Sequence, residues 1–333
     1  MKILLDLLDL LDDPHVTGES VVNRLKSWGV KHASSKTIGT TGKTTDFVSV
    51  LIPGRNGKTA GGNAPTLGIV GRLGGLGARP VLIGFTSDGD GALAALTIAA
   101  KLGQMHERGD ILEGDIMIRT HVCPNAPTRP HKPVPFMDSP VTSAQCNAEE
   151  VDPAMDALLS IDTTKGNRIL NARGIAITPT VKDGYLLRTS EDLLSILEST
   201  TGCLPMVLPL TQQDITPYGN DVYHLNSILQ PSVATESPCV GVAITTQSQV
   251  AGCATGATHV PDVDEAVRFS IESRPGLHSR QVPLLRQRRV PASGQQVRHS
   301  LPLQNHGEIK HDLDYLDGRL HCPAYNRGTS QAN

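Results

Sequence analysis

The chain has few aromatic side chains and almost no excess of charge of either sign. Phe, Trp and Tyr make up 3% of its 333 residues, and its formal net charge at pH 7 is −3. Few aromatics leave few surfaces on which nucleic-acid bases could stack. The lack of a positive excess removes the attraction to phosphates that nucleic acids and anionic membranes would exert. We therefore expect neither nucleic acid nor a membrane as a partner.

Long apolar runs and paired cysteines are also absent. No run approaches the roughly 20 apolar residues that a membrane-spanning helix needs. Acidic residues, among them Asp6 and Asp9, interrupt the leucine-rich start, which therefore lacks the uninterrupted apolar region of a secretory signal. The six cysteines form no CxxC pair and show no disulfide-framework spacing. These features together predict a cytoplasmic protein.

Short apolar segments alternate with helical patterns along most of the chain. A strand-like segment at 80–85 precedes an alanine-rich helical segment at 92–102, and another at 239–246 precedes a helical segment at 263–271. Alternation of this kind is typical of βα units. It predicts an α/β fold of three layers, in which a mostly parallel or mixed sheet is flanked by helices.

The composition changes after residue 272. Arginines cluster between 280 and 298, and neither Phe nor Trp occurs in 273–333. Such a segment buries too little apolar surface to offset the entropy lost on ordering. We predict a single α/β domain over 1–272 and a basic, poorly ordered tail over 273–333.

The segment Ser-Asp-Gly-Asp-Gly at 87–91 lies between a predicted strand and a predicted helix. Loops at the carboxyl ends of strands tend to carry ligand and catalytic groups in such folds. The glycines let the backbone turn sharply and leave Asp88 and Asp90 accessible, and carboxylate oxygens suit divalent cations. We predict a metal-binding role for Asp88. Asp90 is expected either to cap the following helix or to contact substrate.

His121 and Cys123 end the next predicted strand, in Thr-His-Val-Cys-Pro. Two residues apart on an extended chain, they point to the same side of the sheet. They suit metal ligation or a pairing of nucleophile and base. A buried histidine satisfied by hydrogen bonds beside an inert cysteine explains the pattern equally well, and the sequence leaves both interpretations open.

Further polar loops follow other predicted strands. Asp162 ends an apolar strand, and because a lone buried carboxylate is costly, its expected partner is a metal ion or Lys165. His259 follows a Gly-Cys-Ala-Thr-Gly-Ala-Thr segment. Several such loops at one edge of a sheet predict a single site. The polar side chains that we expect to contact substrate there are Asp90, His131, Lys165, Asp214 and Asn220.

Six segments carry a resemblance to a known family. They are Gly-Asn-Ala-Pro-Thr-Leu-Gly-Ile-Val-Gly-Arg-Leu-Gly-Gly (62–75), Ser-Asp-Gly-Asp-Gly-Ala-Leu-Ala-Ala-Leu (87–96), Thr-His-Val-Cys-Pro (120–124), Ser-Ile-Asp-Thr-Thr-Lys-Gly-Asn-Arg (160–168), Gln-Asp-Ile-Thr-Pro-Tyr-Gly-Asn (213–220) and Gly-Cys-Ala-Thr-Gly-Ala-Thr-His (252–259). Over residues 1 to about 272, the chain resembles the bacterial and fungal proteins grouped as domain of unknown function 1177. That family carries no established activity.

More distantly, the order of these parts is similar to the zinc aminopeptidase fold with two co-catalytic metals. This resemblance implies that Asp88, Asp162 and His259 bind a divalent metal, zinc or manganese. It places His121 and Cys123 where those enzymes carry their paired catalytic glutamates, which are missing here. It also places Arg72 near the position of an early metal-binding histidine.

Three functions are consistent with these residues. The leading hypothesis is a metal-dependent hydrolase that acts on a small peptide or amide, with His121 as a base or a further ligand. The second is a cofactor-independent amino-acid racemase-like enzyme, in which Cys123 and Cys253 are opposed thiols that act as acid and base. The third is a non-catalytic protein that binds a small ligand or peptide on a degenerate peptidase fold, which Arg72 favours. The glycine-rich face at 67–77 is compatible with a homo-oligomer as well as with a core position.

Overall fold

The computed structural model describes residues 1–40, 43–72, 74–76, 84–130, 136–164, 166, 170–209, 227–247 and 258–274. All of them lie within one compact unit. The last described helix, α6, spans Val260–Glu272, so nearly all of the predicted tail lies outside the described residues.

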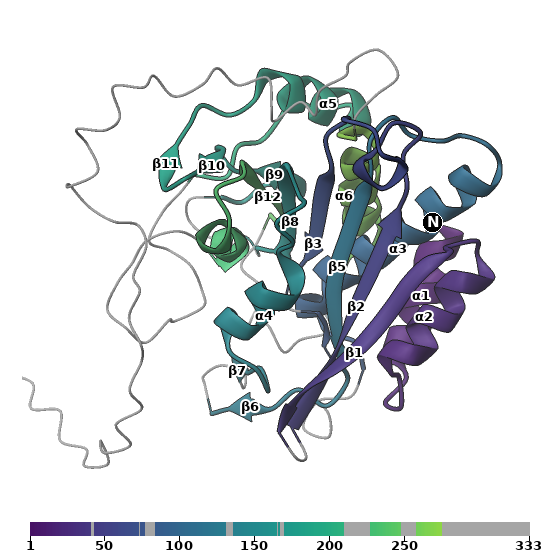
Figure 1. The fold of residues 1–333 in the computed structure, drawn as a ribbon. Coiled ribbons are helices and arrows are strands. Elements are labelled where there is room, and N and C mark those ends of the chain that lie inside the picture. The colour runs from purple at the N-terminus through teal and green to yellow at the C-terminus, as the bar shows by residue number, and fades with distance from the viewer. Residues whose placement is uncertain are drawn as a thin grey trace, which may run out of the picture. The chain divides into compact units, whose positions relative to one another are not determined.

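Ten strands of the described chain form one mixed sheet (Figure 1). Its main path runs in the order β1 (His32–Thr40), β2 (Lys43–Ile52), β5 (Ile116–Cys123), β3 (Leu67–Gly71), β8 (Ala157–Thr163), β12 (Cys239–Thr245), β10 (Val181–Lys182) and β11 (Tyr185–Leu186). The central strands β5, β3, β8 and β12 are parallel, whereas β1 and β2 are antiparallel to their neighbours. The predicted α/β fold with a mixed sheet is therefore confirmed.

Four short strands add to this path or lie apart from it. The strand β4 (Gly75–Leu76) pairs with the end of β5, and β9 (Gly174–Ile177) pairs with β12. The strands β6 (Thr128–Arg129) and β7 (Phe136–Met137) form a separate two-stranded sheet.

Helices cover both faces of the main sheet, which gives three layers (Figure 1). One face packs against a large core that includes side chains from α1 (Lys2–Asp12), α2 (Gly18–Ser27), α3 (Asp90–Glu107), α5 (Glu191–Thr201) and α6. The other face carries the shorter helices α4 (Ser143–Glu150) and η3 (Ser227–Ala234). No helix of the described part of the chain has the length and apolar character to cross a bilayer.

The central helix α3 is buried over most of its length because sheet and helices surround it. Its start lies directly against the ends of two parallel strands. A Cβ atom on Gly91 would lie 2.5 Å from the carbonyl oxygen of Ile161 and 2.7 Å from that of Arg72. Only glycine permits this approach, and it brings the first turn of α3 to the edge of the sheet where the parallel strands end, the carboxyl edge.

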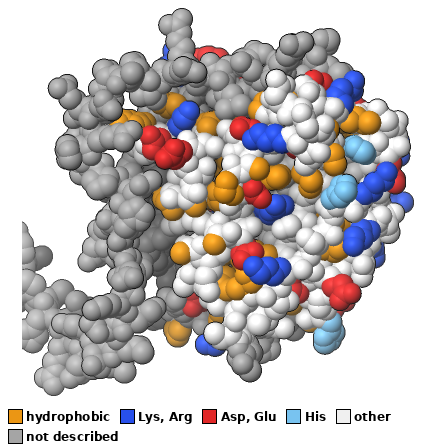
Figure 2. All heavy atoms as spheres, in the orientation of Figure 1, with side chains coloured by type: hydrophobic (Ala, Val, Ile, Leu, Met, Phe, Trp, Pro, Cys, Tyr) orange, Lys and Arg blue, Asp and Glu red, His pale blue; other side chains and the backbone are white. Residues whose placement is uncertain are grey.

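On the face drawn in Figure 2, basic and acidic side chains are interspersed. This mixture is consistent with the near-neutral net charge of the chain.

Candidate functional site

Three predicted site residues lie at the carboxyl edge, and all three carboxylates are buried. Asp88 lies in the short helix η2 (Ser87–Gly89), Asp90 is the first residue of α3, and Asp162 is the last residue but one of β8. Their exposed fractions are 5%, 0% and 1%. Buried carboxylates need compensating partners, and each of these three aspartates has at least one polar or electrostatic partner.

Asp90 joins two segments that are distant in sequence. Thr258 Oγ1 donates a hydrogen bond to Asp90 Oδ1 (2.8 Å), and Thr163 Oγ1 lies 3.3 Å from Asp90 Oδ2. The helix α3 begins at Asp90, and its N-cap residue is Gly89, which has no side chain to cap it. The carboxylate of Asp90 thereby joins Thr258, just before α6, to the end of β8.

His259 follows Thr258 and is oriented by a second carboxylate. Its Nδ1 lies 2.8 Å from Asp262 Oδ2, and its side chain is 46% exposed, whereas that of Asp262 is 3% exposed. When the imidazole is neutral, this hydrogen bond places the proton on Nδ1. Nε2 then carries the lone pair that accepts a proton or binds a metal.

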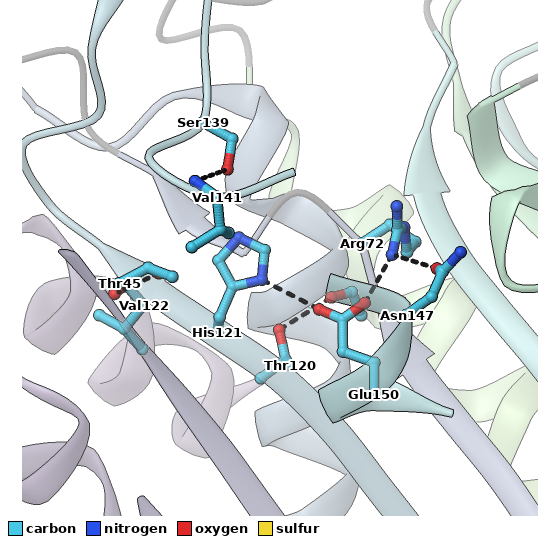
Figure 3. A network of polar contacts seen from close by, with 10 residues as sticks. Thr45, Arg72, Thr120, His121, Val122, Ser139, Val141, Asn147 and Glu150 are labelled. Atoms are coloured by element: carbon cyan, nitrogen blue, oxygen red, sulfur yellow. Dashed lines mark hydrogen bonds and ion pairs between the residues drawn. The ribbon is translucent and has the colours of Figure 1, made fainter. Parts of the chain in front are cut away.

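A buried network lies on the α4 side of the same edge (Figure 3). Glu150, the last residue of α4, lies between two cationic or protonatable groups: its Oε2 is 2.6 Å from Arg72 Nη1 and its Oε1 is 2.9 Å from His121 Nδ1. Asn147 Oδ1 accepts a longer hydrogen bond, 3.4 Å, from the same Arg72 nitrogen. The side chains of Arg72, His121 and Glu150 are at most 6% exposed.

The electrostatics of this network favour a permanent ion pair. Burial alone raises the pKa of Glu150, but the charge of Arg72 and the contact with His121 outweigh it, and the pKa is lowered overall. Burial likewise lowers the pKa of Arg72, but Glu150, Cys146 and Asp162 outweigh it, and the pKa is raised overall. Arg72 therefore supplies a fixed positive charge close to Asp162.

The contacts of His121 and Cys123 match the structural interpretation of this pair. The His121 ring packs 5.2 Å from the ring of Phe47, and a Cβ on Gly74 would lie 2.4 Å from its Cδ2. Cys123 is buried, its Sγ lies 3.7 Å from the carbonyl oxygen of Thr44, and burial raises the pKa of its thiol to about 11. A thiol of this kind is a weak nucleophile and a poor metal ligand at neutral pH.

Several polar residues of this region were not predicted from the sequence, and some predicted site residues lie outside the described ranges. Glu150 and Asn147 belong to a polar helix whose sequence does not distinguish them. Thr163 and Thr258 are each adjacent to a predicted ligand, and this adjacency could have identified them. Within the described ranges, no three His, Cys, Asp or Glu side chains are grouped so as to hold a metal ion. The predicted site residues outside the described ranges are His131, Lys165, Asp214, Asn220 and Cys253.

Comparison with known proteins agrees with the fold. A family model described as "Protein of unknown function (DUF1177)" matches residues 36–288. A tomato leucine aminopeptidase mutant is similar in structure, with a TM-score of 0.50 and 11% identity over 81% of this chain. This chain covers 61% of the tomato enzyme, which is less than two thirds of its length. At such low identity the likeness shows the fold alone, and it confirms the predicted aminopeptidase-like architecture.

Two further solved structures are more remote. The bottromycin maturation enzyme BotP has a TM-score of 0.46 and 16% identity, with 81% of this chain and 69% of that chain covered. The LapA aminopeptidase of Legionella pneumophila has a TM-score of 0.44 and 14% identity, with 78% and 64% covered. No curated protein matches the sequence.

Proposed function

Since the chain belongs to the DUF1177 family of proteins of unknown function, we propose its function from the site itself: hydrolysis of a small peptide or amide at the carboxyl edge of the sheet. The observation that carries this proposal is the convergence of Thr163 and Thr258 on Asp90. Each threonine adjoins a predicted ligand, Asp162 or His259. The aminopeptidase-like fold supports the same class of reaction.

Two carboxylates and an imidazole oriented by another carboxylate are ligand types that zinc and manganese take, and Asp88, Asp162 and His259 supply these types at this edge. As described, the three side chains are not grouped closely enough to hold an ion, so the proposal requires them to come together when an ion binds. The described side chains do not fit a second ion beside Glu150, since the guanidinium of Arg72 already lies 2.6 Å from that carboxylate. When bound, the ion would polarise the carbonyl group of the substrate.

The protein's own residues supply the organisation of the site. Asp90 fixes the two loops relative to α3, and Asp262 holds the imidazole of His259 with Nε2 available. Arg72 adds a positive charge near Asp162 that does not depend on pH. Because these groups lie in or beside the protein interior, where the effective dielectric is low, their charges act more strongly than they would in water.

Metal analysis of the full-length chain, purified without chelator, tests the proposal. We expect the wild-type chain to hold about one divalent ion and to release free amine from dipeptide or amide substrates. We expect both Asp88→Ala and Asp162→Ala to lose the ion. Asp9→Ala is the matched control, because Asp9 is an exposed aspartate of α1. Wild-type protein that holds no metal and turns over no dipeptide or amide would contradict the proposal.

A second candidate function is binding of a peptide or small ligand without turnover. The ion pair of Arg72 and Glu150 favours it, because a buried guanidinium fills a place that a catalytic cation would need. Under this alternative, dipeptides raise the melting temperature of the chain and are recovered unchanged. Under the hydrolase proposal, the same incubation yields free amino acids.

The racemase-like alternative needs a thiolate at Cys123. The raised pKa of that thiol, about 11, opposes this requirement, and its partner Cys253 lies outside the described residues.

A further inference from the structure

The two ends of the sheet path differ in how far they are protected against pairing with another strand. At one end, β10 and β11 have two residues each and are joined by a tight turn, in which Asp183 and Gly184 have left-handed backbones (φ 49° and 75°). At the other end, β1 has nine residues. Short edge strands resist pairing with other chains, whereas long ones present a row of free N–H and C=O groups.

The strand β1 has few of the features that protect edge strands. It pairs with β2 at nine successive positions without a bulge, and it contains no proline. Its lysine, Lys36, is held by Glu149 of α4 at 2.6 Å. Figure 1 shows β1 at the end of the sheet, with no described element paired to its far side.

Within the described part of the chain, neighbouring elements lie against the faces of β1, and no strand pairs with its outer edge. On one face, α2 packs so closely that a Cβ on Gly18 would lie 2.9 Å from Ser35 Cβ. On the other face, the pair of Lys36 and Glu149 connects β1 to α4. Alternate residues of β1 direct their backbone N–H and C=O groups away from β2, so a second strand can add in the plane of the sheet.

We propose that two copies of the chain pair antiparallel through β1 and form one continuous sheet across a two-fold axis. Such an interface is self-complementary, because each copy presents the same strand. Nine residues span about 30 Å, close to the width of a standard interface of ~800 Å² per partner. The side chains near the middle of β1, Ser34, Ser35 and Thr37, are small and mostly exposed, which allows close approach.

A second copy fits this edge better than a foreign peptide does. Strand-adding peptides gain specificity from pockets that receive alternate side chains, and small hydroxyl side chains form no such pockets. The proposal does not depend on the hydrolase activity. Its test measures mass and amide protection, so that its failure and the failure of the proposed function are distinguishable.

Light scattering after size-exclusion chromatography of the full-length chain tests the pairing. We expect twice the mass of one chain. Ser34→Lys would bring four lysines together near the two-fold axis and raise the dissociation constant by about tenfold or more, since like charges on facing strands repel. Ser195→Lys is the matched control, because this exposed serine lies on α5, far from β1 in the sheet order. It should leave the mass unchanged.

Hydrogen exchange provides a second readout that a misfolded variant would not mimic. The amides of β1 that point away from β2 should be protected in the wild-type chain and lose that protection in Ser34→Lys, while amides of β5 remain protected in both. A single-chain mass with rapid exchange of these outward amides would overturn the proposal. A single-chain mass with protected outward amides would overturn it too, because another segment of the same chain would then cover the edge.

Discussion

The guanidinium of Arg72 lies 2.6 Å from the carboxylate of Glu150, and both side chains are buried where β3 ends beneath α4. An exposed pair elsewhere in the molecule, Lys36 and Glu149, has the same separation of 2.6 Å. The two contacts join neighbouring glutamates of one helix to different strands. Their energetic roles differ because burial, and not distance, determines what is lost when one partner is removed.

Replacing Arg72 by methionine should destabilise the chain strongly. The change leaves Glu150 buried without its cation, which costs about 3–5 kcal/mol for pairs of this kind. Lys36→Met breaks the exposed pair and should cost at most about 1 kcal/mol. Urea denaturation measures both free energies of unfolding. Equal losses in the two variants would show that the buried pair is not a compensated ion pair.

The contribution of Glu150 should depend on pH in a defined direction. Its pKa is lowered in the folded chain, so its charged form stabilises the fold above the ordinary carboxyl pKa of about 4.3. This stabilisation is lost as the pH falls through the folded pKa. The difference in unfolding free energy between wild type and Glu150→Gln should be largest near neutral pH and shrink below about pH 4. A difference that stays constant from pH 7 to pH 3 would contradict the assignment, and Glu149→Gln serves as the control.

The thiol of Cys123 should react slowly with alkylating reagents. With a pKa raised to about 11, it is a thiolate in only about one molecule in a thousand at pH 8. Cys203 is free and exposed and provides the internal comparison. Mass spectrometry of peptides after timed iodoacetamide treatment should show alkylation of Cys203 at least about 100-fold faster. Comparable rates would restore the racemase-like hypothesis.

Removing the hydroxyl of Thr258 should weaken the carboxyl edge. Thr258→Val deletes the donor to Asp90 Oδ1, and hydrogen bonds to charged groups contribute about 1.5–3 kcal/mol. Thr201→Val is the control, because that hydroxyl contacts the backbone of Leu197 and Cys203 at the end of α5, away from the carboxylates of the site. Under the proposed function, metal content should fall in Thr258→Val and remain unchanged in Thr201→Val. Unchanged metal content and stability in both variants would remove Asp90 from the organisation of the site.

The buried parallel part of the fold could be predicted from sequence, and the open edge could not. Apolar segments such as that at 239–246 are nearly continuous because both faces of their strands are covered, and β12 confirms this prediction. The strand β1, His-Ala-Ser-Ser-Lys-Thr-Ile-Gly-Thr, shows no hydrophobic alternation because most of its residues are exposed. A strand with few buried residues does not need alternating apolar residues, so its sequence does not indicate a strand.

Residues of the candidate site could be predicted only where a reactive side chain interrupts a recognisable sequence pattern. Asp88, Asp90 and Asp162 stand out because carboxylates interrupt apolar or glycine-rich segments. Glu149 and Glu150 look equivalent in sequence, yet the first is partly exposed beside Lys36 and the second is completely buried against Arg72. Only the packing of α4 against the ends of β3 and β5 separates them.

The positive charge of Arg72 is covalently part of the chain, so no chelator can extract it. Glu150 therefore stays neutralised whether or not an ion occupies the carboxyl edge. We expect dialysis against EDTA to leave the circular dichroism spectrum and the cooperativity of unfolding intact, in contrast to small domains whose folding requires zinc. An ion-free preparation could then be reloaded stepwise with zinc or manganese, which makes occupancy and activity separately titratable in a single folded sample.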